Sequence, residues 1–313
     1  MAEFFMVPDT PECHAVYDRA REIFYTHFAH LFAEKGGPIY REEVPYEGGV
    51  LPCWRVLPDG ASKGTILFHG GNDSLLEEFT DALLYLAQGG YTVLAFEGPG
   101  QGAALRKSGL TFTPEWEKPV GAVLDHYGAE DVTIIGVSLG GELCMRAAAM
   151  EPRIRRVVSW SVLPSIYGAL MADKPAEIRA KLEHWLDENN RDAILDLYAG
   201  LAEREPLFRW SIQHSNYAYG TSDVYEYLQK ARAFTIEPVA ERITQDVLLL
   251  SAREDLLVDF ALYKQEIDLL KNTRSLEFAA PGRALNGQAH CNMGNTKYML
   301  DLILNWNDRM LER

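Results

Sequence analysis

One stretch, Asp131 to Ala149, constrains the fold of this chain more than any other. Its sequence, DVTIIGVSLGGELCMRAAA, predicts a buried strand over 132–137, a tight turn at Ser138 and a helix from Leu139. The turn fits the pattern G-x-S-x-G, whose glycines leave room for a sharp bend. A serine on such a turn stands at a strand's carboxyl end and over a helix N-terminus, where backbone N–H groups favour negative charge. We interpret Ser138 as a candidate nucleophile. The alternative is an ordinary turn whose serine caps the helix.

Strands and helices alternate on both sides of this turn. Strands are expected at 39–46, 50–57, 64–68, 91–96, 132–137, 156–162, 246–251 and 275–279. Helices are expected at 11–35, 73–88, 115–128, from 139, 258–271 and 295–311. Apolar strands that alternate with helices predict an α/β fold, with a mostly parallel eight-stranded sheet covered by helices on both faces.

The alternation stops between residues 165 and 235, which contain helical runs but no convincing strand. The helical runs are 176–187, 191–203 and 222–233. We predict a helical cap here, over the carboxyl edge of the sheet. The expected domains are an N-terminal helical segment (1–38), a core (39–164 and 236–313) and the cap (165–235). Aromatic residues are dense in and near the cap, which suggests an aromatic-lined pocket, with ordinary packing as the alternative. They are Trp160, Tyr167, Trp185, Tyr198, Trp210, Tyr217, Tyr219, Tyr225 and Tyr227.

Composition narrows the class of partner. The formal net charge of −15 argues against nucleic acid and anionic membranes, which bind clustered Lys and Arg. The four cysteines show no C-x-x-C spacing, so neither a disulfide framework nor a zinc site is expected. The first residues lack a basic n-region, and no apolar run is long enough to cross a bilayer. We expect a soluble cytoplasmic protein with a small-molecule substrate; a homodimer is compatible with the sequence.

A serine hydroxyl needs a base, and the base needs an orienting carboxylate. On a sheet with this kind of serine turn, the acid and then the histidine follow the serine in the chain. His290 lies between the last strand and the last helix, and we predict it as the base, with a helix-capping histidine as the alternative. Asp255 is the first aspartate after the strand at 246–251 and is the predicted acid. Asp259 and Glu254 are its alternatives, although Asp259 resembles a helix N-cap.

Binding of an oxyanion requires two N–H groups. Leu139, directly after the serine, is expected to supply one. The other is expected from the glycine-containing loop after the third strand, with Gly71 as the first candidate and Asn72 as the second. His69 in the same region is expected to brace this loop rather than to transfer protons. The turn EGPGQG begins at Glu97, which could reach the pocket, although bracing of the turn is the favoured interpretation.

Four motifs in this order resemble the α/β-hydrolase superfamily and, within it, the FrsA-like branch, which includes 2,6-dihydroxypseudooxynicotine hydrolase and fungal polyketide-shortening hydrolases. The motifs are FHGGNDS with two glutamates at 77–78, EGPGQG at 97–102, GVSLGG at 136–141 and AHC at 289–291. The resemblance implies an α/β-hydrolase fold, a Ser-His-Asp triad, no cofactor or metal, and a cap with an N-terminal helical piece over the site. Relatives of this kind hydrolyse esters or cleave a carbon–carbon bond next to a ketone. In the carbon–carbon-cleaving relatives an acidic residue assists, and Glu97 is the matching position.

The expected function is therefore that of a serine hydrolase, with Ser138 as nucleophile, His290 as base and Asp255 as acid. Ester hydrolysis and carbon–carbon bond hydrolysis are both open. The alternatives are a non-catalytic small-molecule binding protein on the same scaffold, or an acyltransferase that excludes water.

Overall fold

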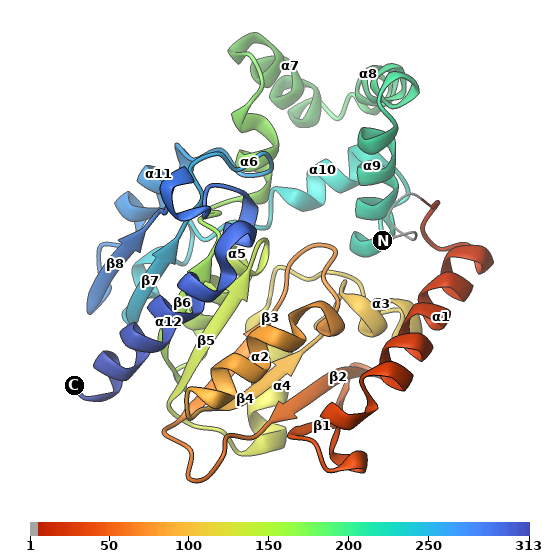
Figure 1. Ribbon diagram of the computed structural model, residues 1–313. Coiled ribbons are helices and arrows are strands. Elements are labelled where there is room, and N and C mark those ends of the chain that lie inside the picture. The colour runs from red at the N-terminus through yellow and green to blue at the C-terminus, as the bar shows by residue number, and fades with distance from the viewer. Residues whose placement is uncertain (1–5) are drawn as a thin grey trace.

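The computed structural model describes residues 6–313 and shows an eight-stranded sheet across the centre of the molecule (Figure 1). The strands are β1 (Ile39–Tyr46), β2 (Gly49–Val56), β3 (Thr65–His69), β4 (Thr92–Phe96), β5 (Val132–Val137), β6 (Ile154–Trp160), β7 (Asp246–Leu250) and β8 (Ser275–Ala279). Their spatial order is β1-β2-β4-β3-β5-β6-β7-β8. β1 and β2 are antiparallel to their neighbours, whereas β3 to β8 run parallel. The predicted α/β fold is confirmed.

Helices cover both faces of the sheet, so the central strands are apolar on both sides. β5 and β7 are buried along their whole length, whereas the edge strands β1 and β8 are partly exposed. The core helices are α1 (Pro11–His27), α2 (Thr80–Gln88), α3 (Gly102–Ser108), α4 (Glu117–Tyr127), α5 (Gly140–Met150), α11 (Leu262–Leu269) and α12 (Thr296–Leu311). One buried cluster joins α3, α4, α5 and α11 to the sheet, and a second joins α2 and α12 to its other face.

Several boundaries differ from the sequence expectation. The first helix ends at His27 rather than 35, and two 3-10 turns follow it. This bend packs Phe32 edge-on against Trp54 of β2, with ring centroids 5.3 Å apart. The strand expected at 156–162 is β6, which ends at Trp160, where its pairing with β7 ends and the chain leaves the sheet. Helix α3 was not predicted. The expected N-terminal segment, 1–38, begins outside the described residues.

The segment between β6 and β7 contains five helices and lies beyond one end of the sheet (Figure 1). They are α6 (Ile166–Ala172), α7 (Ala176–Asp187), α8 (Arg191–Arg204), α9 (Pro206–Tyr219) and α10 (Val224–Ala231). Its aromatic rings pack largely on one another. Tyr219 contacts Tyr227 at 5.0 Å, both are buried, and Tyr198 stacks on Phe208. These contacts of Tyr198, Tyr219 and Tyr227 match ordinary packing, the alternative to an aromatic-lined pocket.

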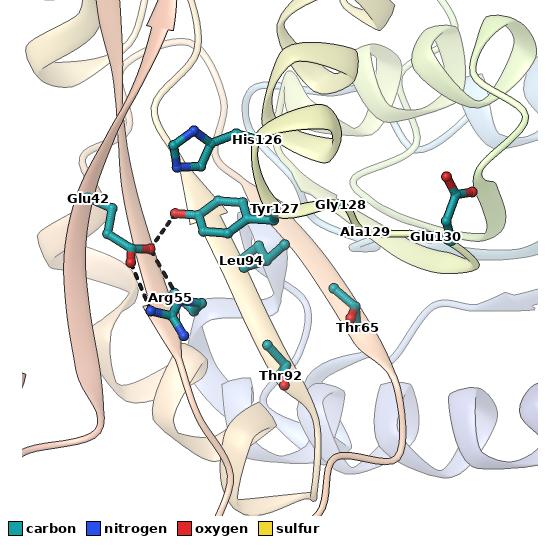
Figure 2. Close-up of a pocket in the computed structure, with 10 residues that line it drawn as sticks. All are labelled: Glu42, Arg55, Thr65, Thr92, Leu94, His126, Tyr127, Gly128, Ala129 and Glu130. Atoms are coloured by element: carbon teal, nitrogen blue, oxygen red, sulfur yellow. Dashed lines mark hydrogen bonds and ion pairs between the residues drawn. The ribbon is translucent and has the colours of Figure 1, made fainter.

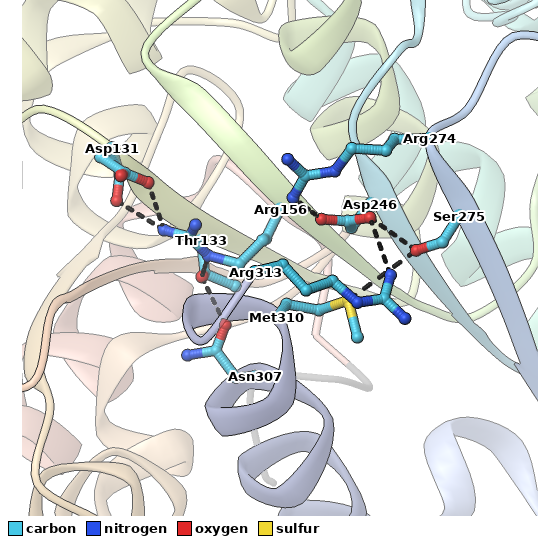
Figure 3. A network of polar contacts seen from close by, with 9 residues as sticks. All are labelled: Asp131, Thr133, Arg156, Asp246, Arg274, Ser275, Asn307, Met310 and Arg313. Atoms are coloured by element: carbon cyan, nitrogen blue, oxygen red, sulfur yellow. Dashed lines mark hydrogen bonds and ion pairs between the residues drawn. The ribbon is translucent and has the colours of Figure 1, made fainter.

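Ion pairs join the amino ends of the parallel strands, at the edge of the sheet opposite Ser138 (Figure 3). Buried Arg156 of β6 donates to Asp131 at 2.6 Å and to Thr133 of β5 at 2.8 Å. Asp246 of β7 is paired with Arg274 and accepts from Ser275 at 2.6 Å. Burial acts to raise the pKa of Asp246, but these hydrogen bonds hold it below its ordinary value. One set of contacts links β5 to β6 and the other links β7 to β8, both away from the serine turn.

None of the helices within residues 6–313 combines the length and the apolar character needed to span a bilayer.

Helix α1 packs against the core through polar groups as well as aromatic rings. Arg21 and Tyr25 donate to the Glu77 carboxylate at 3.0 and 2.7 Å. Glu77 belongs to the segment that follows the loop after β3, so α1 is tied to the part of the core that borders Ser138.

Candidate active site

Ser138 occupies the strained turn between β5 and α5. Its φ of 60° lies in the left-handed region, which residues other than glycine rarely adopt. A Cβ on Gly136 would lie 1.9 Å from the carbonyl oxygen of Gly140, so the bend requires glycine. The Ser138 N–H donates to the Trp160 carbonyl at 3.0 Å, which fixes the turn against the end of β6.

Two hydrogen bonds connect Ser138, His290 and Asp255. Nε2 of His290 lies 2.9 Å from Ser138 Oγ, and Nδ1 of the same ring lies 2.7 Å from Asp255 Oδ2. The alternatives to Asp255 point elsewhere. Asp259 accepts the Ala261 N–H before α11, and Glu254 pairs with a surface arginine. The structure thus brings together the three side chains selected from the sequence, in a geometry that allows proton transfer from the serine to the imidazole.

The environment of His290 favours its charged form. Burial of the imidazole acts to lower its pKa, but the Asp255 carboxylate and the Cys291 thiol outweigh that effect, and the pKa of His290 lies above its ordinary value. The Asp255 side chain is only 4% exposed, so little water screens the pair. An imidazolium formed during a reaction would therefore be stabilised where it stands.

Asn292 holds the loop that carries His290, a role that the sequence analysis missed. Its buried carboxamide accepts from Trp160 Nε1 at 3.2 Å and donates to the carbonyls of Ser251 and Gly287 at 3.0 and 2.6 Å. Asn292 has a φ of 55°, in the left-handed region that asparagine tolerates better than most residues. An asparagine two residues after a predicted base was the available signal.

The loop after β3 lies directly against the serine turn. A Cβ on Gly71 would lie 2.8 Å from Ser138 Cβ and 2.9 Å from the Leu139 nitrogen. However, the Gly71 N–H already donates to Ser74 Oγ at 2.8 Å. The N–H groups of Asn72 and Leu139 have no hydrogen-bond acceptor within the described part of the chain. The geometry therefore favours Asn72, the second candidate, over Gly71 as the partner of Leu139.

His69 braces this loop from beneath. It is fully buried, its Nδ1 lies 3.1 Å from the Gly70 carbonyl oxygen, and its Nε2 accepts from Trp116 Nε1 at 3.3 Å. Burial lowers the pKa of His69 to about 4, so the ring is neutral near pH 7. Both ring nitrogens are occupied within the core, in accord with a bracing role rather than a substrate contact.

Glu97 is also occupied by the backbone. One carboxylate oxygen accepts the Leu76 N–H at 3.0 Å and the other accepts the Ala103 N–H at 2.6 Å. Burial raises the pKa of Glu97 to about 7, and the nearby Glu77 adds to this effect. These contacts match bracing of the turn, the interpretation favoured from the sequence, and none of them reaches Ser138.

His214 of α9 reaches the same loop from the cap. No role was predicted for His214 from the sequence, because a histidine on a helix carries no specific signal. Its Nε2 donates to the Asn72 carbonyl at 3.1 Å, and its ring stacks on Trp210 with centroids 5.2 Å apart. The cap therefore contacts the loop that packs against the serine turn.

An open pocket of about 460 Å³ lies elsewhere on the molecule (Figure 2). It is bordered by Thr65 and Thr92, at the amino ends of β3 and β4, and by an ion pair between Glu42 and Arg55. Ser138, Asp255 and His290 follow the carboxyl ends of their strands, at the opposite edge of the sheet, so this pocket is separate from them. Within residues 6–313, no three His, Cys, Asp or Glu side chains are grouped as a metal site.

Comparison with known sequences supports the fold assignment. Residues 66–286 match the family described as alpha/beta hydrolase fold. The alpha/beta hydrolase psoB of Aspergillus fumigatus is 32% identical over 217 residues, which cover 62% of this chain and 48% of psoB. The hydrolase ORFZ of Pyricularia oryzae is 29% identical over 92% of this chain and 71% of its own length. The chain thus spans about half of psoB and a larger share of ORFZ.

Solved structures show the same fold at low sequence identity. A 2,6-dihydroxy-pseudo-oxynicotine hydrolase superposes with a TM-score of 0.70 at 18% identity, covering 96% of this chain and 75% of that one. The Pyrococcus furiosus esterase Pf2001 superposes with a TM-score of 0.54 at 17% identity, covering 87% and 93%. Since the family match covers most of the sequence and includes the serine turn, the chain belongs to the α/β-hydrolase family.

Proposed function

We propose that the protein is a serine hydrolase that forms an acyl-enzyme on Ser138. The observation that carries the proposal is the connected pair of hydrogen bonds, 2.9 Å from Ser138 Oγ to His290 and 2.7 Å from His290 to Asp255. A serine on a strained turn, a base within bonding reach and a buried carboxylate behind it are the parts that acyl transfer requires.

The reaction begins when His290 takes the proton from Ser138 Oγ as this oxygen attacks a substrate carbonyl. Asp255 orients the imidazole and stabilises the imidazolium. The N–H groups of Leu139 and Asn72 bind the oxyanion of the tetrahedral intermediate. His290 then gives its proton to the leaving group, and a water molecule, activated by the same imidazole, releases the acyl group from Ser138.

The substrate class that we propose is a small molecule with an ester, or with a ketone whose neighbouring carbon can leave as a stabilised carbanion. The same steps serve both, because only the leaving atom differs: an alkoxide oxygen in one case and an enolate or phenolate carbon in the other. Among similar structures, one is named an esterase and one a 2,6-dihydroxy-pseudo-oxynicotine hydrolase. The negative charge of the chain favours a neutral or cationic small molecule over a polyanion.

The test compares Ser138→Ala with Ser211→Ala, which removes a hydroxyl from cap helix α9 that donates to its own backbone. Both variants are assayed on p-nitrophenyl esters of graded acyl length and on β-diketones. Ser138→Ala is expected to lower kcat by roughly a million-fold, as removal of a triad serine does elsewhere, and Ser211→Ala to leave it unchanged. A fluorophosphonate should label Ser138 alone. Full activity of Ser138→Ala would refute the proposal.

A further inference from the structure

The side chain of Gln101 spans from the turn after β4 to the loop after β3. Its Nε2 donates to two consecutive backbone carbonyls, those of Gly70 at 2.8 Å and Gly71 at 3.0 Å. Its Oε1 accepts the Gly98 N–H at 2.9 Å. Both amide hydrogens and the amide oxygen are therefore used, and the side chain is 1% exposed.

The turn that carries Gln101 is itself fixed on both sides. Glu97, at the start of the turn, accepts the N–H of Ala103 directly after the turn and the N–H of Leu76 in the segment that follows the loop after β3. A Cβ on Gly100 would lie 2.2 Å from the Phe112 ring, so the chain passes directly over that ring. The Gln101 carboxamide thus projects from a turn that is held by contacts of its own, in addition to those with the carbonyls of Gly70 and Gly71.

The hydrogen bond to the Gly71 carbonyl has a geometric consequence for the next residue. The carbonyl of Gly71 and the N–H of Asn72 belong to one planar peptide group, and in a trans peptide they point in opposite directions. Gln101 holds the carbonyl end. The N–H end then points away from Gln101, while Gly71 packs against Ser138 and the Leu139 nitrogen.

We propose that Gln101 is a positioning residue of the oxyanion hole, which aims the Asn72 N–H by holding the Gly71 carbonyl. The proposal rests on the function proposed above, because it assigns Asn72 as an oxyanion donor. It also explains why a glutamine stands in the G-P-G-Q-G turn. Only a side chain with two hydrogen-bond donors and one acceptor satisfies Gly70, Gly71 and Gly98 together.

The test uses Gln101→Met, which keeps the length of the side chain and removes all three hydrogen bonds. Gln245→Met is the matched control, because the Gln245 amide also donates to a backbone carbonyl, that of Ala148, outside the site. We expect Gln101→Met to lower kcat by about 10- to 100-fold, less than complete loss of an oxyanion donor, with KM within about twofold of wild type. An alkylboronic acid, whose adduct with serine places an oxygen in the oxyanion hole, should bind more weakly by the same factor.

Gln101→Glu provides a second test in case Gln101→Met does not fold. It preserves the shape and, when protonated, keeps one donor, so an intermediate loss in kcat is expected, and the thermal midpoints of both variants show whether either has lost its fold. A crystal structure of Gln101→Met should show the Gly71–Asn72 peptide rotated from its wild-type orientation. If that peptide is unmoved, and kcat and boronate affinity match those of Gln245→Met, the proposal is overturned.

The same experiment separates the two proposals. If Ser138→Ala is as active as wild type, the serine hydrolase proposal fails, whatever Gln101 does. The orientation of the Gly71–Asn72 peptide in Gln101→Met still decides whether Gln101 sets it, since that readout does not require turnover. If Ser138→Ala is inactive and Gln101→Met is unaffected in every measurement, only the role of Gln101 is refuted.

Discussion

The Asp255 carboxylate connects two parts of the site. One oxygen lies 2.7 Å from His290 Nδ1, and the other accepts the N–H groups of Leu257 and Val258 at 2.8 and 3.1 Å. The backbone contacts fix the carboxylate, and the carboxylate fixes the ring. This relationship determines both the orientation of the imidazole and its affinity for a proton.

Replacing Asp255 by asparagine should therefore change the rate and its pH dependence together. The asparagine oxygen is needed by the N–H groups of Leu257 and Val258, so the NH₂ group faces His290 Nδ1. A donor there stabilises the tautomer with the proton on Nε2, which cannot take the serine proton, so kcat is expected to fall by about 10⁴. Since Asp255 raises the pKa of His290, and since only the neutral ring can act as a base, activity in the wild type rises as pH increases through that pKa. In Asp255→Asn this rise should move to lower pH.

The measurement is kcat/KM against pH for wild type, Asp255→Asn and Asp259→Asn. Asp259→Asn serves as the control, because Asp259 caps a nearby turn without contacting His290. Its profile should overlay that of wild type. A rise at the same pH in Asp255→Asn and wild type would show that Asp255 does not govern the base.

The features that could be predicted from the sequence were those with a local signature. The alternation of apolar strands and helices predicts the fold, and the glycines around Ser138 indicate the turn. Asp255 and His290 follow from chain order, because their loops leave adjacent strands at the same edge of the sheet. Because both loops lie at the edge of the sheet where Ser138 stands, their position was sufficient to select Asp255 and His290.

The parts that were not predicted depend on contacts between distant segments. Gly71 was the first candidate for the second N–H donor, but its N–H donates to the Ser74 hydroxyl, and nothing in the loop sequence shows which way a peptide group faces. Gln101 lies within the EGPGQG motif, but its contacts with the Gly70 and Gly71 carbonyls, like that of His214 with the Asn72 carbonyl, cross between elements and leave no local signature. The end of the first helix was set by the packing of Phe32 on β2, a tertiary contact that overrides helical periodicity.

The structure also predicts the outcome of substituting Glu97. Its two oxygens each accept a backbone N–H, and an amide would place an NH₂ group against one of these donors. Glu97→Gln should therefore reduce the free energy of unfolding by about 1–3 kcal/mol. Glu97 acts on the site only through the turn that carries Gln101, and Glu97→Gln retains one of its two backbone contacts, so kcat on esters should fall less than in Gln101→Met, by less than about tenfold.

Chemical denaturation and parallel assays on esters and β-diketones check this prediction. Glu203→Gln, an exposed change in the cap, is the control for stability. A selective loss of activity on ketones in Glu97→Gln, with normal ester hydrolysis and stability, would instead assign Glu97 a direct part in carbon–carbon cleavage.

Two buried glutamates make the stability of the fold depend on pH. Glu142 of α5 and Glu266 of α11 are each about 1% exposed or less. Burial raises the pKa of both carboxyl groups to about 8. At Glu142, Arg146 opposes the rise, whereas Glu266 and Glu117 add to it. At Glu266, a hydrogen bond with the Leu163 backbone opposes the rise. For an acid whose pKa is raised on folding, the stabilisation is complete below the unfolded pKa near 4.5 and is lost as pH rises through 8.

Glu266→Gln should remove part of this loss, because a neutral amide has no charge to desolvate. The free energy of unfolding of the variant is expected to exceed that of wild type by roughly 1–3 kcal/mol at pH 8, and the difference should shrink toward pH 5. Urea titrations at several pH values measure it. A difference that is constant between pH 5 and 8 would mean that Glu266 does not titrate on unfolding in this range.

The contact between His214 and the Asn72 carbonyl predicts that the cap influences the rate of the chemical step. His214→Phe keeps a flat ring to stack on Trp210 but removes the donor, whereas His214→Gln keeps a donor and loses the ring. If the hydrogen bond is what matters, His214→Phe should lower kcat by about 3- to 10-fold, the value of one hydrogen bond, and His214→Gln should lower it less.

His184→Phe on the exposed face of α7 is the matched control. Equal kcat in His214→Phe and wild type would show that the cap packs on the loop without holding it. An equal loss in both His214 variants would instead point to the ring stacking rather than to the hydrogen bond.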